Sequence, residues 1–307
     1  MIHRKYEMSH GGILETYLQD SQITYKKYKK YKKKPAMIIC PGGAYLIHAT
    51  KEGEPVAVEF MQAGFQCFVL CYSIGTDREH PEKGISPEAK YPIQVLQLME
   101  AMHLLHEHAD EWKIDEEQIF VSGFSAGGHV AASLAVRWND PKLLEQLDFT
   151  PKGKELKPAG AVLGYPMLRL NQDFFMEKES VEQEMKENTK KLYQTIFHTD
   201  EPDEKQKESV NLLNYISENT APAFLWNCID DPVVNYTNAM DYVNKCVKNG
   251  VACEYHLFSQ GGHGLSVNTE LTVMDEREID FSVTQWKLLA IEWCRKRIRN
   301  KMTEEEA

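Results

Sequence analysis

The chain has 307 residues, of which 42% are hydrophobic and 26% charged, and its formal net charge at neutral pH is −11. This length and composition are sufficient for a globular core, and the negative charge argues against nucleic acid as the main partner. No run of about 18 consecutive apolar residues is present, so the sequence predicts neither a membrane-spanning helix nor a membrane partner.

Strands are the first predicted elements, over residues 13–31. Residues 26–34 carry seven lysines interleaved with Tyr28 and Tyr31. Such a run is compatible with a nucleic-acid patch or with an edge strand that charge protects from further pairing. The acidic total favours the edge strand.

Residues 37–40 predict a short buried strand that runs into a glycine turn, Pro41-Gly42-Gly43-Ala44-Tyr45. A glycine turn can expose consecutive backbone N–H groups to an anion. Gly43 and Ala44 are therefore candidate donors, and Tyr45 is a candidate substrate contact. A plain turn is the alternative interpretation.

The next segments alternate between helix and strand. Residues 55–63 predict a helix, residues 66–72 a strand and residues 76–91 a polar excursion. The helix that follows has an apolar stripe of the kind that packs on a sheet, which indicates core and not a cofactor site. The stripe consists of Val95, Leu98, Met99, Met102 and Leu105.

The most informative motif is Gly123-Phe124-Ser125-Ala126-Gly127. A buried strand at residues 118–121 precedes it and a small-residue helix follows it, which is the context of a nucleophile elbow. Ser125 is therefore the candidate nucleophile, Ala126 a further candidate N–H donor and Phe124 a candidate substrate contact. The alternative is a structural turn with an inert serine.

A strand predicted at residues 159–165 is followed by a long charged and amphipathic segment. Residues 167–220 predict a helical insert, with aromatic side chains among acids and lysines. The insert is either a cap that lines a substrate pocket or a helical cover for the sheet.

A serine nucleophile needs a base, and an acid to hold that base. The predicted strand at residues 223–228 leads into Asp230 and Asp231, which compete for the role of acid. We favour Asp231 because Pro232 fixes the chain directly after it. Asp230 is then expected to be exposed or to cap the next helix.

The chain has 11 histidines, and position selects one of them as the base. His263 lies in a glycine-rich loop after a predicted strand at residues 254–258, where the backbone is free to place an imidazole over a neighbouring strand end. An exposed loop histidine is the alternative. His129, one turn after Ser125, is expected to pack or hydrogen-bond under the elbow.

Four segments together resemble α/β-hydrolases of the acetyl esterase/lipase type, in the BD-FAE-like group that is similar to acetyl-xylan and feruloyl esterases. They are CPGGAY at 40–45, GFSAGGHVAA at 123–132, IDDPVV at 229–234 and GGHGLS at 261–266. The resemblance implies an α/β fold with a mostly parallel central sheet flanked by helices, in one domain over residues 1–307 with a helical cap at 167–220. The chain departs from the His-Gly-Gly-Gly loop of lipase relatives at Pro41 and Ala44.

The resemblance implies a serine carboxylic-ester hydrolase for short acyl esters, acetyl esters above all, including those of sugars or xylo-oligosaccharides. Its catalytic residues would be Ser125, Asp231 and His263, and its oxyanion hole would be formed by Gly43, Ala44 and Ala126. An amidase, peptidase or arylformamidase on the same triad is one alternative. A catalytically silent binding protein on the same scaffold is the other.

Cysteine usage bears on the compartment. Several of the seven cysteines lie in apolar strand-like runs, which indicates reduced core thiols, and the N-terminus lacks the apolar segment of a signal peptide. We therefore expect a cytoplasmic protein. No Cys/His spacing matches a zinc site, so we expect neither metal nor cofactor, and the expected partner is a small ester, with homodimer formation left open.

Overall fold

The fold is built on an eight-stranded sheet with the strand order β1-β2-β4-β3-β5-β6-β7-β8. In this computed structural model residues 1–20, 33–76, 82, 84–170, 182–270, 272–273 and 279–305 are described. The β1–β2 and β2–β4 pairs are antiparallel and all other pairs are parallel. The strands are β1 (Lys5–Glu7), β2 (Ile13–Tyr17), β3 (Lys34–Cys40), β4 (Gln66–Cys71), β5 (Ile114–Phe124), β6 (Ala161–Gly164), β7 (Ala223–Cys228) and β8 (Cys253–Phe258).

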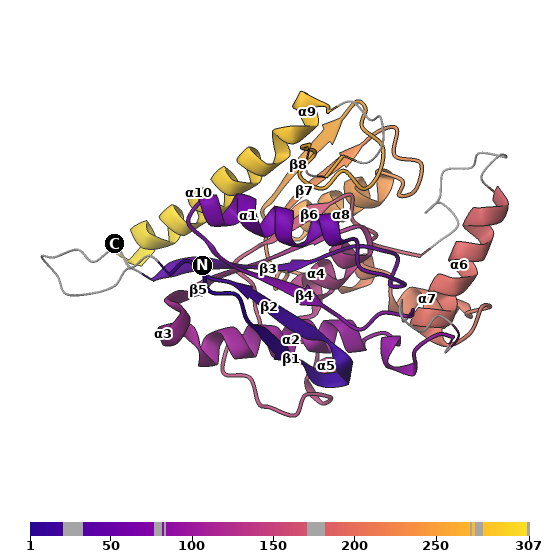
Figure 1. The fold of residues 1–307 in the computed structure, drawn as a ribbon, viewed down its shortest axis with the longest axis horizontal. Coiled ribbons are helices and arrows are strands. Elements are labelled where there is room, and N and C mark those ends of the chain that lie inside the picture. The colour runs from indigo at the N-terminus through magenta and orange to yellow at the C-terminus, as the bar shows by residue number, and fades with distance from the viewer. Residues whose placement is uncertain are drawn as a thin grey trace, which may run out of the picture.

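Helices cover both faces of this sheet (Figure 1). One face packs against α1 and α10, and the other packs against α2, α4 and α8. The α-helices are α1 (Glu54–Gln62), α2 (Ile93–Glu107), α3 (Ala109–Trp112), α4 (Ser125–Arg137), α5 (Pro141–Leu144), α6 (Glu182–Phe197), α7 (Glu204–Ser209), α8 (Thr237–Lys248), α9 (Phe281–Thr284) and α10 (Trp286–Glu305). The 3₁₀ helices are η1 (Ser9–Gly11), η2 (Thr50–Glu52), η4 (Pro87–Ala89) and η6 (Leu212–Tyr215).

Burial on both faces explains the continuous apolar runs of the central strands. In β3, Met37 and Ile39 point to the α1 and α10 side, whereas Ile38 and Cys40 point to the side of α2 and α4. All four side chains are fully buried. A parallel strand with helices on both sides has no face for polar residues, so its sequence does not alternate.

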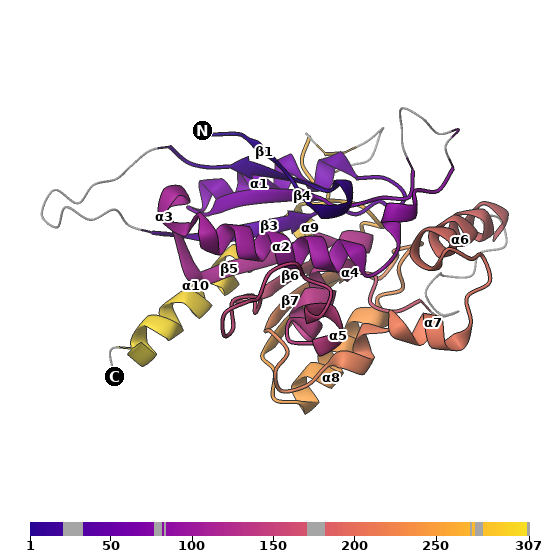
Figure 2. The same cartoon turned by 90° about the horizontal axis from the view of Figure 1, so that it is seen from below.

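The segment between β6 and β7 contributes α6, α7 and η6. Figures 1 and 2 both show α6 and α7 together beside one end of the sheet. The N–H group of Tyr91 donates to the carbonyl of Ile196 on α6 over 3.2 Å. A Cβ at Gly75, in the loop after β4, would lie 2.3 Å from Thr195 Oγ1. The insert therefore rests on loops at the carboxyl end of the sheet.

The structure confirms the predicted α/β class, the mostly parallel sheet and its flanking helices. The predicted strand at 223–228 and helix at 55–63 correspond to β7 and α1, with bounds shifted by one residue in α1. The expected lysine-rich edge strand at 26–34 lies outside the described residues, except for Lys33 and Lys34.

All seven cysteines are free thiols, and five of them are buried. No helix in the described ranges combines the length and apolar character needed to cross a membrane.

Candidate active site

Ser125 lies at the turn that joins β5 to α4, and its own backbone is left-handed, with φ of 50°. A Cβ at Gly123 would lie 2.1 Å from the carbonyl oxygen of Gly127, and a Cβ at Gly127 would lie 2.0 Å from that of Cys40. Neither position has space for a side chain because strand, helix and β3 approach so closely. This strained turn has the geometry of a nucleophile elbow.

Ser125, His263 and Asp231 come from three separate loops and form one hydrogen-bonded chain. The Nε2 atom of His263 lies 3.0 Å from Ser125 Oγ, and its Nδ1 atom lies 2.7 Å from Asp231 Oδ2. The Asp231 side chain is fully buried and that of His263 is 17% exposed. When Nδ1–H donates to the carboxylate, Nε2 is left as an acceptor for the serine proton, as a general base requires.

The loop after β7 fixes the orientation of Asp231. Its Oδ1 atom accepts hydrogen bonds from the N–H groups of Val233 and Val234, at 2.8 Å and 2.9 Å. These bonds occupy one carboxylate oxygen, so the other is directed at His263. Pro232 lies between the aspartate and both donors, where the sequence places the turn.

Asp230 is exposed and contacts the loop that carries His263, called here the histidine loop (residues 259–266). Its two carboxylate oxygens accept from the N–H groups of Gly261, at 3.1 Å, and Gly262, at 2.9 Å. The sequence predicts exposure correctly but gives no indication of this contact. The adjacent aspartates thus do different things: one faces the imidazole, and the other holds its backbone.

Three successive left-handed residues form the loop after β3, called here the glycine loop (residues 41–47). Gly43, Ala44 and Tyr45 have φ values of 120°, 56° and 61°. The N–H groups of Leu46 and Ile47 both donate to the carbonyl of Gly43, over 3.0 Å each. Left-handed backbone at two non-glycine residues costs about 1–3 kcal/mol each, so the surrounding structure must hold this loop in place.

The predicted N–H donors belong to two adjoining turns. Within the ranges that the structure describes, the N–H groups of Gly43, Ala44 and Ala126 have no hydrogen-bond partner in the protein. A Cβ at Gly42 would lie 3.0 Å from the Cβ of Ser125, so the glycine loop touches the elbow. Unpaired N–H groups next to a candidate nucleophile are suited to an oxyanion.

Tyr45 and Phe124 do not lie where the sequence-based interpretation puts them. Both side chains are fully buried, so the expectation that they contact substrate is wrong for the side chains. Phe124 packs against Tyr165, at 5.7 Å between ring centroids, and against Trp286, at 5.6 Å. The Tyr45 hydroxyl donates over 2.7 Å to Nδ1 of His129. Both rings belong to the core beneath the site.

His129 hydrogen-bonds beneath the elbow, as predicted. Its Nδ1 atom accepts from Tyr45, and its Nε2–H donates to the carbonyl of Val210 over 2.9 Å. This pairing requires the neutral imidazole. Burial lowers the pKa of His129 to about 4, and the Val210 carbonyl only partly offsets that effect. The imidazole thus links α4, the glycine loop and the end of the insert.

We expect the neutral His129 to make the fold less stable in acid. The unfolded chain binds a proton at this position near pH 6.5 and the folded chain does so only near pH 4, so the contribution is complete above 6.5 and is lost as the pH falls toward 4. The difference corresponds to about 3 kcal/mol. The free energy of unfolding, measured by urea denaturation above pH 6.5 and near pH 4, should fall less in acid for His129→Gln than for the wild type. Equal losses of stability would contradict a neutral, buried His129.

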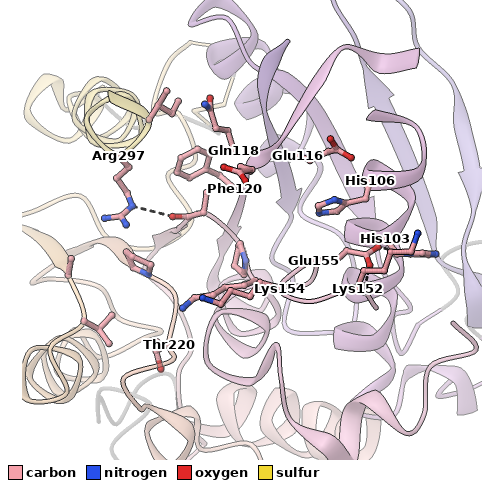
Figure 3. A pocket seen from close by; sticks show the side chains of 18 of the residues that line it. His103, His106, Glu116, Gln118, Phe120, Lys152, Lys154, Glu155, Thr220 and Arg297 are labelled. Atoms are coloured by element: carbon pink, nitrogen blue, oxygen red, sulfur yellow. Dashed lines mark hydrogen bonds and ion pairs between the residues drawn. The ribbon is translucent and has the colours of Figure 1, made fainter. Parts of the chain in front are cut away.

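A separate hollow of about 1030 Å³ lies at the opposite edge of the sheet, where the amino ends of β5 to β8 meet (Figure 3). None of Ser125, Asp231 and His263 lines it. Two of its charged groups pair with other protein groups: His103 with Glu155, and the Nε–H of Arg297 with the carbonyl of Ala159, at 3.2 Å. The groups able to perform acyl transfer lie at the carboxyl edge.

The strand order and the serine at the turn after β5 define the class: this is an α/β-hydrolase fold. The chain belongs to the BD-FAE family, whose pattern matches residues 22–246.

Individual relatives extend this comparison. The chain is 28% identical over 266 residues to endo-1,4-beta-xylanase B of Butyrivibrio fibrisolvens, covering 85% of this chain but only 36% of that protein. A carboxylesterase, Cest-2923 from Lactobacillus plantarum, has a similar structure, with a TM-score of 0.76 and 26% identity over 96% of this chain and 97% of that one. The structure of an acetyl ester-xyloside bifunctional hydrolase from Caldicellulosiruptor lactoaceticus is also similar, with a TM-score of 0.69 and 26% sequence identity. The match covers 93% of this chain and 88% of that one.

Proposed function

We propose that the protein is a serine carboxylic-ester hydrolase that removes short acyl groups, acetyl above all, from sugars such as xylo-oligosaccharides. The observation that carries the proposal is the hydrogen-bonded chain from Ser125 Oγ through His263 to Asp231. It supplies the base that a serine hydroxyl needs at neutral pH.

The proposed reaction has two halves. Ser125 Oγ attacks the ester carbonyl while His263 Nε2 takes its proton, and Asp231 stabilises the imidazolium that forms. The N–H groups of Ala126 and of Gly43 or Ala44 receive the developing oxyanion. His263 then protonates the departing alcohol. In the second half the same imidazole takes a proton from water, the resulting hydroxide attacks the acyl carbon, and His263 returns the proton to Ser125 Oγ as the acid leaves.

The substrate class is inferred from relatives and from the insert. The named relatives include an endo-1,4-beta-xylanase and an acetyl ester-xyloside bifunctional hydrolase, which favours acetylated xylan fragments as substrates. We assign residues 167–220 as a cap within a single domain, because α6 rests on the loops at the carboxyl edge; residues 171–181 of this range lie outside the described residues. A cap in this place would shape the pocket for the acyl group or the alcohol.

A substrate panel tests the proposal. Acetylated xylo-oligosaccharides, feruloyl esters, nitrophenyl esters, an aminoacyl-anilide and N-formylkynurenine are compared by kcat/KM, with Ser125→Ala as the matched control. We expect turnover of acetyl esters that exceeds turnover of the anilide and of the formamide. Faster cleavage of either nitrogen compound would contradict an esterase. Failure of a fluorophosphonate to label Ser125 would indicate a binding protein instead.

A further inference from the structure

We propose that Glu52 is a positioning residue that holds the glycine loop and the histidine loop in register around Ser125. The inference rests on the proposed ester hydrolysis, since it concerns the same site. Glu52 ends η2, ten positions after Gly42 in the chain, and its side chain is buried, with only 2% exposed. Nothing in the local pattern around it distinguishes it from a surface acid.

The first link runs from Glu52 to the glycine loop. Its Oε2 atom accepts the N–H group of Gly42 over 2.7 Å. A Cβ at Gly42 would lie 2.6 Å from that same oxygen, 2.7 Å from the carbonyl oxygen of Phe124 and 3.0 Å from Ser125 Cβ. The Gly42 peptide is therefore held between the carboxylate and the elbow. Its position sets where the next N–H groups, those of Gly43 and Ala44, stand relative to the serine.

The second link runs from Glu52 to the histidine loop through Tyr165. The Tyr165 hydroxyl donates to Glu52 Oε1 over 2.7 Å and accepts the N–H group of Ser266 over 2.9 Å. The ring of Tyr165 packs edge-on against the imidazole of His263, with 4.8 Å between centroids and 62° between planes. The buried side chain of Tyr165 thus connects the Glu52 carboxylate to the backbone of the histidine loop and to the imidazole of His263.

Ser266 receives two more contacts that close the network. Its hydroxyl donates to the carbonyl of Lys51, the residue before Glu52. The indole N–H of Trp286, at the start of α10, donates to the Ser266 carbonyl over 2.9 Å. The η2 segment therefore contacts the histidine loop directly through Lys51 and indirectly through Tyr165, and it contacts the glycine loop through Glu52, so a shift of η2 would move both loops.

The buried carboxylate of Glu52 needs hydrogen-bond donors around it. Burial raises the pKa of Glu52, while the hydrogen bonds from Tyr165 and Gly42 and the attraction of His263 oppose that rise. Both contacts come from donors, and a carboxylate accepts both. An amide could accept only one of them and would have to donate to the Tyr165 hydroxyl, which would then lose the acceptor of its own proton. Burying a carboxylate costs stability, and the pKa of Glu52 stays raised despite its hydrogen bonds, so a contribution to folding alone is a poor reason for its presence.

The test compares Glu52→Gln, Glu52→Ala, Tyr165→Phe and the double variant Glu52→Gln/Tyr165→Phe. Glu59→Gln is the matched control, because Glu59 pairs with Lys287 on the flank of α1, away from Ser125. We expect Glu52→Gln to lower kcat about 10-fold and Glu52→Ala about 100-fold, with KM changed by less than about 3-fold, since donors that are slightly misplaced act mainly on the transition state. Tyr165→Phe should add little to Glu52→Gln, because both break the same network.

Melting temperature and the rate of Ser125 phosphonylation are measured on every variant. If kcat and the phosphonylation rate are unchanged in all Glu52 variants, the inference about Glu52 is wrong, but the proposed esterase function is not affected. The same holds if the melting temperature falls while kcat is unchanged. Multiplicative effects of the two substitutions would also overturn it.

A wild type that neither hydrolyses esters nor reacts with the phosphonate would remove the proposed function instead. Hydrogen exchange at the Gly42 and Ser266 amides would then decide the inference. Joint acceleration in Glu52→Gln would support the network, and unchanged exchange would overturn it.

Discussion

Replacing Ser125 with alanine is expected to lower kcat for a short-chain aryl acetate by about 10⁴- to 10⁶-fold, with little change in KM or in melting temperature. The serine hydroxyl forms the covalent bond in the proposed reaction, and alanine has no group that can form it. The substitution removes one oxygen at a position whose backbone is already fixed by the elbow, so the fold should persist. Steady-state rates and thermal unfolding measure both effects.

Ala126→Ser is a suitable control for the serine prediction, because it adds a hydroxyl next to the elbow without changing the backbone N–H group. It should not restore activity to Ser125→Ala, since its side chain leaves the chain at a different angle from the nucleophile. Residual activity in Ser125→Ala of more than about a tenth of the wild type would contradict a serine nucleophile.

Replacing Asp231 with asparagine is expected to lower kcat by about 10⁴-fold. The N–H groups of Val233 and Val234 would retain the amide oxygen at the place of Oδ1. The amide NH₂ would then face Nδ1 of His263, which favours the tautomer with the proton on Nε2. An imidazole in that state cannot accept the serine proton.

Asp230→Asn is the matched comparison for Asp231→Asn, because the two residues are adjacent and carry the same charge. An exposed amide at position 230 would still accept one of the two glycine N–H groups, so we expect kcat to fall less than about 10-fold. Measuring both variants on one ester distinguishes the two carboxylates. A larger loss at position 230 would show that the aspartates have been assigned the wrong way round, and equal losses would contradict a separate role for Asp231.

The sequence was informative where local patterns have a single structural solution. Glycines on either side of Ser125, after an apolar strand, predict the elbow because that turn brings strand and helix too close for a side chain at either glycine. The proline after Asp231 and the glycines beside His263 act in the same local way. Parallel strands then place their carboxyl ends at one edge of the sheet, so residues more than a hundred positions apart meet there.

The sequence was misleading where a side chain's direction depends on packing. Tyr45 follows two left-handed residues, which turn its ring inward to His129, and no periodicity describes such a turn. Phe124 could have been placed by its strand: it lies four residues after Phe120, on the same face, and both rings join the core next to α10.

Glu52 and Tyr165 were not found from the sequence because their function depends on a contact between elements 113 positions apart. The sequence does not distinguish a buried glutamate from an exposed one, and only the packed structure shows which neighbouring groups donate hydrogen bonds to Glu52. The sequence predicts that Asp230 is exposed or caps the next helix, and it is exposed. Its contact with the histidine loop depends on how β7 and β8 end side by side.

The most direct test is to mix the protein with an aryl acetate, quench in acid within the first turnover and locate any acetyl group by peptide mass spectrometry. The mechanism predicts one acetyl group on the peptide that contains Ser125, and a lower level of it in His263→Ala because His263 takes the serine proton in the acylation step. An acetyl group on another residue, or turnover with no trapped acyl group and no burst of the aryl alcohol, would contradict Ser125 as the nucleophile.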